Sequence, residues 1–305
     1  MNSIPALFGW LILVALGLAR VVVSDVEIWA PAFDVAHFLF FAVLAVQLFR
    51  LLTGVRSELL RAALVFLLTL GAVIVLEALQ PWIGQEKDYT DVWIGASGCL
   101  AALLAIFAWR MPAPASRTVL VLAGFAVTMA ALWSPASSLA ARFISASRFP
   151  LLASFESSAA LRLWDVRGCS LSASGSHATH GSRSAEIRTA GDGTSYPGIS
   201  LAVWPRNWLG YRALCMDVET LPGSVVVLWV RLDDKPDASY DDRLQTRCAL
   251  QPGSNAVRID LDANLLTPSG RRFDLSRVRR LTIFFEESVV PWSCYLDHVR
   301  LVQCP

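Results

Sequence analysis

Charged residues are scarce in this sequence, and neither sign is in excess. Only 17% of the 305 residues are charged, and 26 basic residues against 25 acidic ones give a formal net charge of +1. A protein that binds nucleic acid normally carries a strongly basic surface, because it must neutralise phosphates. The charge balance therefore argues against nucleic acid as a partner.

Clustered cysteines are also missing. None of the six cysteines stands in a CxxC motif or at a Cys/His spacing typical of zinc, so no zinc–thiolate site is expected. If the second half of the chain lies in an oxidising compartment, one or two disulfides are expected there, and their pairing is left open by the sequence. The cysteines of that half are Cys169, Cys215, Cys248, Cys294 and Cys304.

Apolar residues, in contrast, are abundant and unevenly distributed. They make up 55% of the chain and give a mean hydropathy of +0.50. A helix needs about 20 residues to cross about 30 Å of hydrocarbon, and five segments reach that length. We expect membrane-spanning helices at about 4–24, 33–52, 60–79, 91–110 and 117–136. No Lys or Arg precedes the first apolar run, which favours a retained helix over a cleaved signal peptide.

The loops between these helices differ in charge, and this difference predicts their orientation. The loops after the second and fourth helices are basic, whereas the other two are mainly acidic. Because basic loops stay in the cytoplasm, we expect a cytoplasmic N-terminus and an extracytoplasmic chain beyond residue 136. The basic residues that set this orientation are Arg50, Arg56, Arg61, Arg110 and Arg117.

Three pairs of polar residues fall at the outer ends of the predicted helices. Within helices, a spacing of three residues places both members of a pair on one face, so the three pairs could form one pocket. An alternative is that they are ordinary interfacial residues or helix caps. The pairs are Asp34 with His37, Glu77 with Gln80, and Asp88 with Asp91.

These motifs give residues 34–105 a resemblance to the VanZ-like family of small bacterial membrane proteins. That family has Asp/Lys-x-x-His, then Glu-x-x-Gln, then Asp followed by Asn and Gly on one helix face. The matching residues are Asp34 and His37, Glu77 and Gln80, and Asp91 and Gly98. Two positions depart, because Gln85 stands where the family has Arg and Gly95 where it has Asn. The resemblance implies a multi-pass protein of the bacterial inner membrane, and the departures predict that the family's activity is altered or lost.

Residues 137–150 read as a polar linker, and residues 151–305 change to short β-like segments. At least seven such segments, separated by Gly, Pro, Asn and Asp, predict an all-β sandwich. Examples are SAEIRTA, RALCMDVE, SVVVLWVRL and RRLTIFFE. Their order resembles the galactose-binding-like jelly roll of many carbohydrate-binding modules, which implies a glycan partner. The expected fold is thus a five-helix membrane domain followed by a jelly-roll sandwich.

The jelly-roll resemblance suggests two kinds of site. In such modules a structural calcium often joins the first and last strands, and Glu156 and Asp297 occupy the matching places; ordinary surface carboxylates are the alternative. Sugar sites use flat rings against the apolar face of a pyranose. Four aromatic residues near segment ends are candidates, with packing as the alternative, whereas Trp229 is expected in the core. The candidates are Tyr196, Trp204, Tyr240 and Trp292.

Two functions follow from these patterns. The first is an envelope protein whose outer sandwich binds or shields a cell-wall or lipid-linked saccharide. The second is a membrane-embedded enzyme acting on a lipid-linked or phosphate-bearing substrate through Asp34, His37, Glu77 and Asp91, which are acid, base or metal-ligand types. No hydrolase elbow or zinc signature favours an enzyme.

Overall fold

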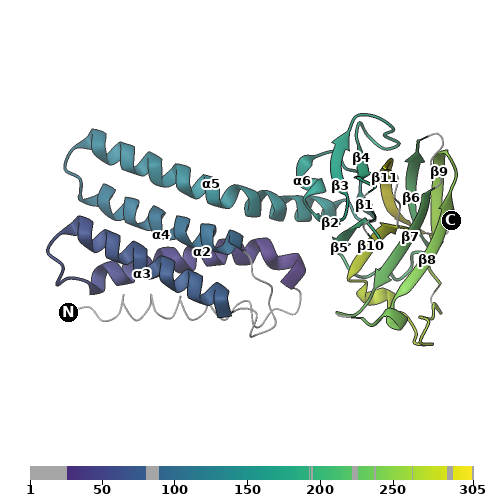
Figure 1. Cartoon of the computed structure of the whole chain (residues 1–305), viewed down its shortest axis with the longest axis horizontal. Coiled ribbons are helices and arrows are strands. Elements are labelled where there is room, and N and C mark those ends of the chain that lie inside the picture. Colours follow the sequence, from purple (N-terminus) through teal and green to yellow (C-terminus); the bar gives the residue numbers. More distant parts are fainter. Residues whose placement is uncertain are drawn as a thin grey trace. The chain divides into compact units, whose positions relative to one another are not determined.

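The computed structural model describes residues 26–79, 89–191, 193, 195–221, 226–236, 238–262, 264–286 and 291–303. The chain divides into two compact units, Met1–Leu139 and Ala140–Pro305. The first unit is helical and the second is mainly β, as the composition predicted. Figure 1 shows the helices in purple to teal and the strands in teal to yellow.

Four helices of the described chain are long and apolar enough to cross a membrane. They are α2 (Val26–Leu51), α3 (Glu58–Leu79), α4 (Tyr89–Arg110) and α5 (Pro114–Ser147). Each contains one predicted span, and the predicted boundaries agree best for α3 and α4. The span predicted at 4–24 lies outside the described residues, so five membrane helices stay a prediction.

Helix α5 extends well beyond its predicted end. Residues 137–147, expected to belong to a linker, continue the helix to Ser147. The stretch SSLAARFISAS contains neither Gly nor Pro, and its alanines favour helix, so nothing in it stops the helix until Pro150. Ala141 is buried in the core of the second unit, which gives this last part of the helix a packing partner.

The helical unit packs around α4. Two glycines on one face of α4 allow α2 and α3 to approach closely. A Cβ at Gly98 would overlap the carbonyl oxygen of Phe38, and one at Gly95 would lie 2.8 Å from side-chain atoms of Phe41 and Val73. Large apolar side chains elsewhere on α3 and α5, such as Leu67 and Phe125, are exposed, as expected for helices that face lipid.

The second unit is a sandwich of two antiparallel sheets. In one sheet the order is β3 (Ser170–Ser174), β4 (Ser184–Thr189), β11 (Trp292–Val302), β6 (Ala213–Thr220) and β9 (Gly253–Asp260), and β1 (Leu151–Ala153) also pairs with β11. In the other the order is β2 (Trp164–Arg167), β5 (Gly198–Ala202), β10 (Arg280–Phe285), β7 (Val226–Asp233) and β8 (Leu244–Leu250). Short helices lie at α6 (Ser158–Leu161), η2 (Tyr240–Asp242) and η3 (Leu275–Arg277).

Alternating side chains of both sheets form the core of the sandwich. Strand β6 buries Leu214, Met216 and Val218, which are two residues apart and therefore share one face. In the facing sheet, β7 and β10 do the same with leucine, valine, isoleucine and phenylalanine. This period of two predicts which side chains the other face presents to solvent, and the outward face of the five-stranded sheet carries the cleft described below.

Candidate functional site

The outward face of the five-stranded sheet holds an open cleft of about 530 Å³. Its floor is formed by β2, β5, β10, β7 and β8, and loop residues close its ends. The side chains that line it combine rings, guanidinium groups and hydrogen-bonding groups. They include Asp165, Arg167, Tyr196, Ser200, Trp229, Arg231, Tyr240, Arg243, Gln245, Arg280, Thr282 and Phe284.

Strand register arranges the floor of this cleft in two rows across the sheet. One row runs through Arg167, Gly198, Phe284, Trp229 and Arg247. The next row runs through Asp165, Ser200, Thr282, Arg231 and Gln245. Gly198 has no side chain to fill its place, and a Cβ there would lie 2.5 Å from the carbonyl oxygen of Ile283. Strand β10 therefore lies too close to β5 at this point for any residue larger than glycine.

The rings of Trp229 and Phe284 lie parallel, with centroids 6.1 Å apart and an interplanar angle of 7°. The ring of Tyr196 meets Phe284 edge-on at 6.0 Å. Trp229 is fixed further because its Nε1 donates to Glu286 Oε1 at 3.2 Å. Arg247 donates to the same oxygen at 3.0 Å and lowers the pKa of Glu286. The strands thus present a rigid aromatic surface, which ring-stacking recognition requires.

Positive charge dominates the cleft lining. Four guanidinium groups, of Arg167, Arg231, Arg243 and Arg280, stand against the single carboxylate of Asp165. Asp233, which is buried, offsets part of this charge, because its carboxylate accepts from Arg231 at 2.8 Å and lies 3.8 Å from Arg243. Counting Asp233, four positive groups face two negative ones, so the cleft favours anions.

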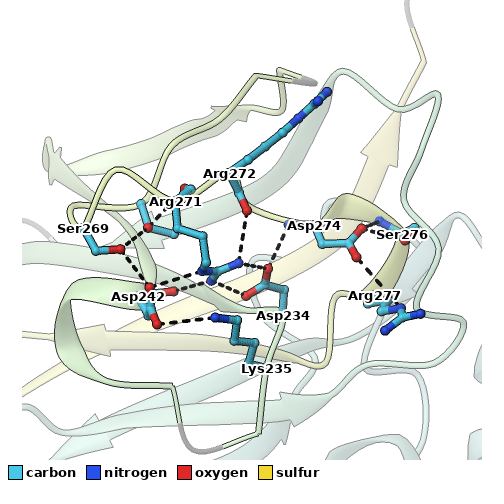
Figure 2. Close-up of polar contacts among 10 residues, drawn as sticks. Asp234, Lys235, Asp242, Ser269, Arg271, Arg272, Asp274, Ser276 and Arg277 are labelled. Carbon is cyan, nitrogen blue, oxygen red and sulfur yellow. Dashed lines mark hydrogen bonds and ion pairs between the residues drawn. The ribbon is translucent and has the colours of Figure 1, made fainter.

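A second polar network fixes the turn that carries Tyr240 into the cleft. Figure 2 shows the Arg271 guanidinium between Asp234 and Asp242. Its NH groups donate to both oxygens of Asp234, at 2.6 and 2.7 Å, and its Nε donates to Asp242 Oδ1 at 3.1 Å. Ser269 donates to the same Asp242 oxygen at 2.8 Å, and these bonds lower the pKa of Asp242. The η2 turn is therefore clamped from the segment before β10.

This network corrects one expectation about charge. The sequence favours a solvated charge run, with the rim of a ligand site as the alternative, for Asp233, Asp234, Asp237, Asp241 and Asp242. In the structure, Asp233 and Asp234 are buried and paired with arginines. The partner Arg271 lies far along the chain from Asp234, so local sequence could not identify the pair; Asp237 is outside the described residues.

The four aromatic candidates from the sequence divide into two groups. Tyr196 and Tyr240 line the cleft and are 59% and 68% exposed. Trp204 lies elsewhere, edge-on to Phe143 at 5.4 Å. Trp292 packs against the core residue Phe285 at 4.5 Å. Trp229 and Phe284 also line the cleft, and the sequence analysis did not name them as candidates. Trp229 was expected in the core, and this expectation is wrong because its ring faces the cleft.

Both candidate calcium ligands hold one loop of the sandwich. Asp297 is buried, and its Oδ2 accepts from the backbone N–H groups of Thr179 and His180, each at 2.8 Å. Glu156 accepts from the backbone of Ser182 and Arg183 at 3.0 Å. Burial raises the pKa of Glu156, but these hydrogen bonds outweigh it and leave the pKa below its usual value. A carboxylate oxygen that accepts a hydrogen bond has a further lone pair for an ion, so these hydrogen bonds leave calcium binding by Glu156 and Asp297 a prediction.

The helical unit brings together three of the predicted polar residues. His37 of α2, Glu77 of α3 and Asp91 of α4 offer ligand atoms that all lie within 4.8 Å of one another. Glu77 and Asp91 are 6% and 2% exposed. Asp34 lies one turn before His37 on α2. Gln80 and Asp88 lie outside the described residues, so the three-pair pocket is described only in part.

The cysteines described in the structure carry no disulfide. They are Cys99, Cys169, Cys215, Cys248 and Cys294, and Cys304 falls outside the described residues. Burial raises the pKa of the Cys294 thiol, and the neighbouring Cys169 raises it further. A raised pKa keeps a thiol protonated and unreactive at neutral pH, so Cys294 is no candidate for a nucleophile.

Comparisons with known proteins reach about half of the chain. It is similar in fold to an exo-β-agarase (13% identity, TM-score 0.44), covering 51% of this chain and 25% of that one. It is also similar to another agarase (14% identity, TM-score 0.40), covering 51% of this chain and 26% of that one. The matched region thus spans only about a quarter of the length of each agarase. A further match is the family 11 carbohydrate-binding module of Clostridium thermocellum, solved with a β-1,3-1,4-mixed-linked tetrasaccharide (15%, TM-score 0.38, covering 50% and 95%). No family model and no curated protein matches the sequence, so the VanZ-like resemblance stays a prediction.

Proposed function

We propose that the sandwich unit binds an anionic polysaccharide in the cleft on its five-stranded sheet. The observation that supports this proposal is the combination of parallel rings, from Trp229 and Phe284, with an excess of guanidinium groups on one exposed strand face. The helical unit would hold this binding surface at a membrane.

The rings favour a sugar over other ligands. A pyranose has one apolar face of C–H groups that covers an aromatic ring, while its hydroxyls need donors and acceptors at the edge. Trp229 and Phe284 offer the rings, and Ser200, Thr282 and Gln245 of the next row offer such edge groups. The open cleft suits a segment of a longer chain.

The arginines indicate the kind of sugar. Guanidinium groups bind carboxylate, sulfate or phosphate through two parallel hydrogen bonds, which a neutral hexose cannot accept in the same way. Arg167 lies on β2 in the same cross-strand row as the rings, and Arg280 lies on β10 two rows further along the cleft. We therefore expect polysaccharides with uronate, sulfate or phosphate groups to bind more tightly than neutral ones.

Binding is tested with the full-length protein in nanodiscs, by affinity electrophoresis through polygalacturonate and through agarose. Trp229→Ala should weaken binding by about 2 kcal/mol, or roughly 30-fold, because it removes a central ring. Arg167→Ala and Arg280→Ala should weaken binding to polygalacturonate more than to agarose, and the difference should shrink at high salt.

Two substitutions outside the cleft are matched controls. Trp204→Ala removes a tryptophan of the same unit, and Arg258→Ala removes an arginine from β9 in the other sheet. Both should leave the affinity unchanged. Retention on neither polysaccharide, or equal loss for Trp204→Ala and Trp229→Ala, would refute binding in this cleft.

We place the protein in the bacterial inner membrane, with a cytoplasmic N-terminus and the sandwich outside. This orientation follows from the basic residues between α2 and α3 and between α4 and α5, among them Arg56 and Arg117. It would give the cleft access to cell-wall or lipid-linked saccharides. Fusion of alkaline phosphatase to the C-terminus tests it, since the enzyme is active only outside the cytoplasm; an inactive, stable fusion contradicts the orientation.

A second candidate function is an enzyme in the helical unit, acting on a lipid-linked or phosphate-bearing substrate. The convergence of His37, Glu77 and Asp91 supports it, because these groups can donate and accept protons in a reaction. A polyprenyl diphosphate in nanodiscs is a suitable probe. Phosphate release that His37→Ala abolishes would support an enzyme, and no release from the wild type would count against it.

A further inference from the structure

The polar cluster inside the helical unit has the composition of a metal site. His37, Glu77 and Asp91 come from three different helices, and one ligand atom from each lies within 4.8 Å of the other two. A metal ion at about 2.0–2.2 Å from each donor requires donor separations of about 3–4.5 Å, so small side-chain movements suffice. We propose that these three residues bind one divalent transition-metal ion.

The packing of the helices holds the three donors in place. Gly95 and Gly98 follow Asp91 by one and two turns, and they permit the close approach of α2 and α3 to α4. Ile94, beside them, is almost fully buried. Donors that stand on packed helices keep their positions, which metal coordination needs more than a flexible loop can offer.

Charge favours an ion at this position. Glu77 and Asp91 are nearly inaccessible to water, and two carboxylates this close would repel each other if both were ionised. A divalent cation between them turns that repulsion into attraction to both. The proposal rests on the approach of the three donors and on their burial, and it is independent of the polysaccharide cleft.

The donor set indicates which ions fit. One imidazole nitrogen and two carboxylate oxygens suit Zn²⁺, Mn²⁺ or Fe²⁺, whereas Ca²⁺ and Mg²⁺ prefer oxygen alone. Three protein ligands leave a coordination position for water or an anionic group. Glu77 also lines a groove of about 520 Å³ between α3 and α4, together with Tyr89 and Trp93, through which such a group could reach the ion.

The test uses the full-length protein in nanodiscs, purified without a histidine tag, and metal analysis by mass spectrometry after dialysis. We expect about one equivalent of Zn²⁺, Mn²⁺ or Fe²⁺. After chelation, added Co²⁺ should give visible absorption bands typical of nitrogen and oxygen ligands, and Zn²⁺ should displace it. The Co²⁺ measurement needs no substitution, so it holds even where a variant fails to fold.

Substitutions then assign the site. His37→Ala and Asp91→Asn should weaken Co²⁺ binding more than roughly 100-fold, since each removes a direct ligand. Glu58→Gln is the matched control, because Glu58 pairs with Arg110 and lies at the first turn of α3, at the opposite end from Glu77. Absence of metal and of Co²⁺ bands in the wild type, or full binding by His37→Ala, would overturn the proposal.

Discussion

Removal of the Arg271 guanidinium should destabilise the sandwich strongly. Arg271 forms two hydrogen bonds with Asp234, whose side chain is only 1% exposed. Arg271→Gln would leave that carboxylate buried, with the backbone N–H of Asp274 as a remaining donor at 2.8 Å. Loss of one partner of a buried ion pair costs about 3–5 kcal/mol.

The lower end of this range applies here. The Arg271 side chain is 24% exposed, so water already screens part of the pair, and water can enter after the substitution. We therefore expect a loss of about 3 kcal/mol, which corresponds to a decrease of roughly 6–12 °C in Tm for a domain of this size.

The assay is thermal unfolding of residues 140–305, followed by circular dichroism, after the wild-type segment has been shown to unfold cooperatively. Arg258→Ala is the matched control, because Arg258 pairs with an exposed Asp260 and should cost less than about 1 kcal/mol. In a double-mutant cycle, Asp234→Asn should recover part of the loss caused by Arg271→Gln, since it removes the buried charge. An Arg271→Gln midpoint equal to that of the control would refute this account of the network.

Three other predictions concern pH, calcium and helix packing. Hydrogen bonds from Ser269 and Arg271 hold the pKa of Asp242 below its usual value, and a hydrogen bond from Arg247 does the same for Glu286. The stability that these two carboxylates contribute is therefore present above about pH 4 and is lost as the pH falls through their pKa values in the folded state. A Tm of residues 140–305 that stays constant from pH 5 to about pH 2 would contradict this. If calcium joins Glu156 and Asp297, a calcium concentration near 100 times Kd should raise the Tm of the same segment by roughly 5–10 °C, and EDTA should reverse this increase. Glu156→Gln should abolish the effect, and a wild-type Tm that EDTA leaves unchanged would refute the calcium site. Gly98→Ala should destabilise the helical unit by about 1–3 kcal/mol because its Cβ meets the Phe38 backbone, whereas Gly71→Ala, with open space around it, should be neutral or slightly stabilising in thermal unfolding of the full-length protein.

The sequence predicts those features of the fold that depend on local pattern. Uninterrupted apolar runs located α3 and α4 within a few residues, and Gly/Pro-bounded β segments predicted the sandwich. The end of α5 was missed because polar residues beyond 136 suggested a linker, although serine, alanine and arginine are all compatible with helix. Polarity indicates where a chain leaves the membrane, but it does not stop a helix.

Features that depend on strand register could not be predicted in the same way. Trp229 stands in the run VVVLWVR, where nearly every residue is apolar, so the alternation that separates the two faces is hidden. Only pairing with β10 shows that Trp229 and Phe284 share the outward face. The ion pair between Asp234 and Arg271 joins residues far apart in the chain, and pairs of this kind are set by topology.

The cleft combines rings of two kinds, and this division links its binding to the stability of the sandwich. Trp229 and Phe284 stand on paired strands and are fixed by the sheet itself. Tyr240 stands on the η2 turn, which Arg271 and Ser269 hold through Asp242. Loss of Arg271 should therefore release Tyr240 while the strand rings keep their places. We infer that Arg271→Gln weakens polysaccharide binding only as far as Tyr240→Ala does, and that the two substitutions together weaken it no further.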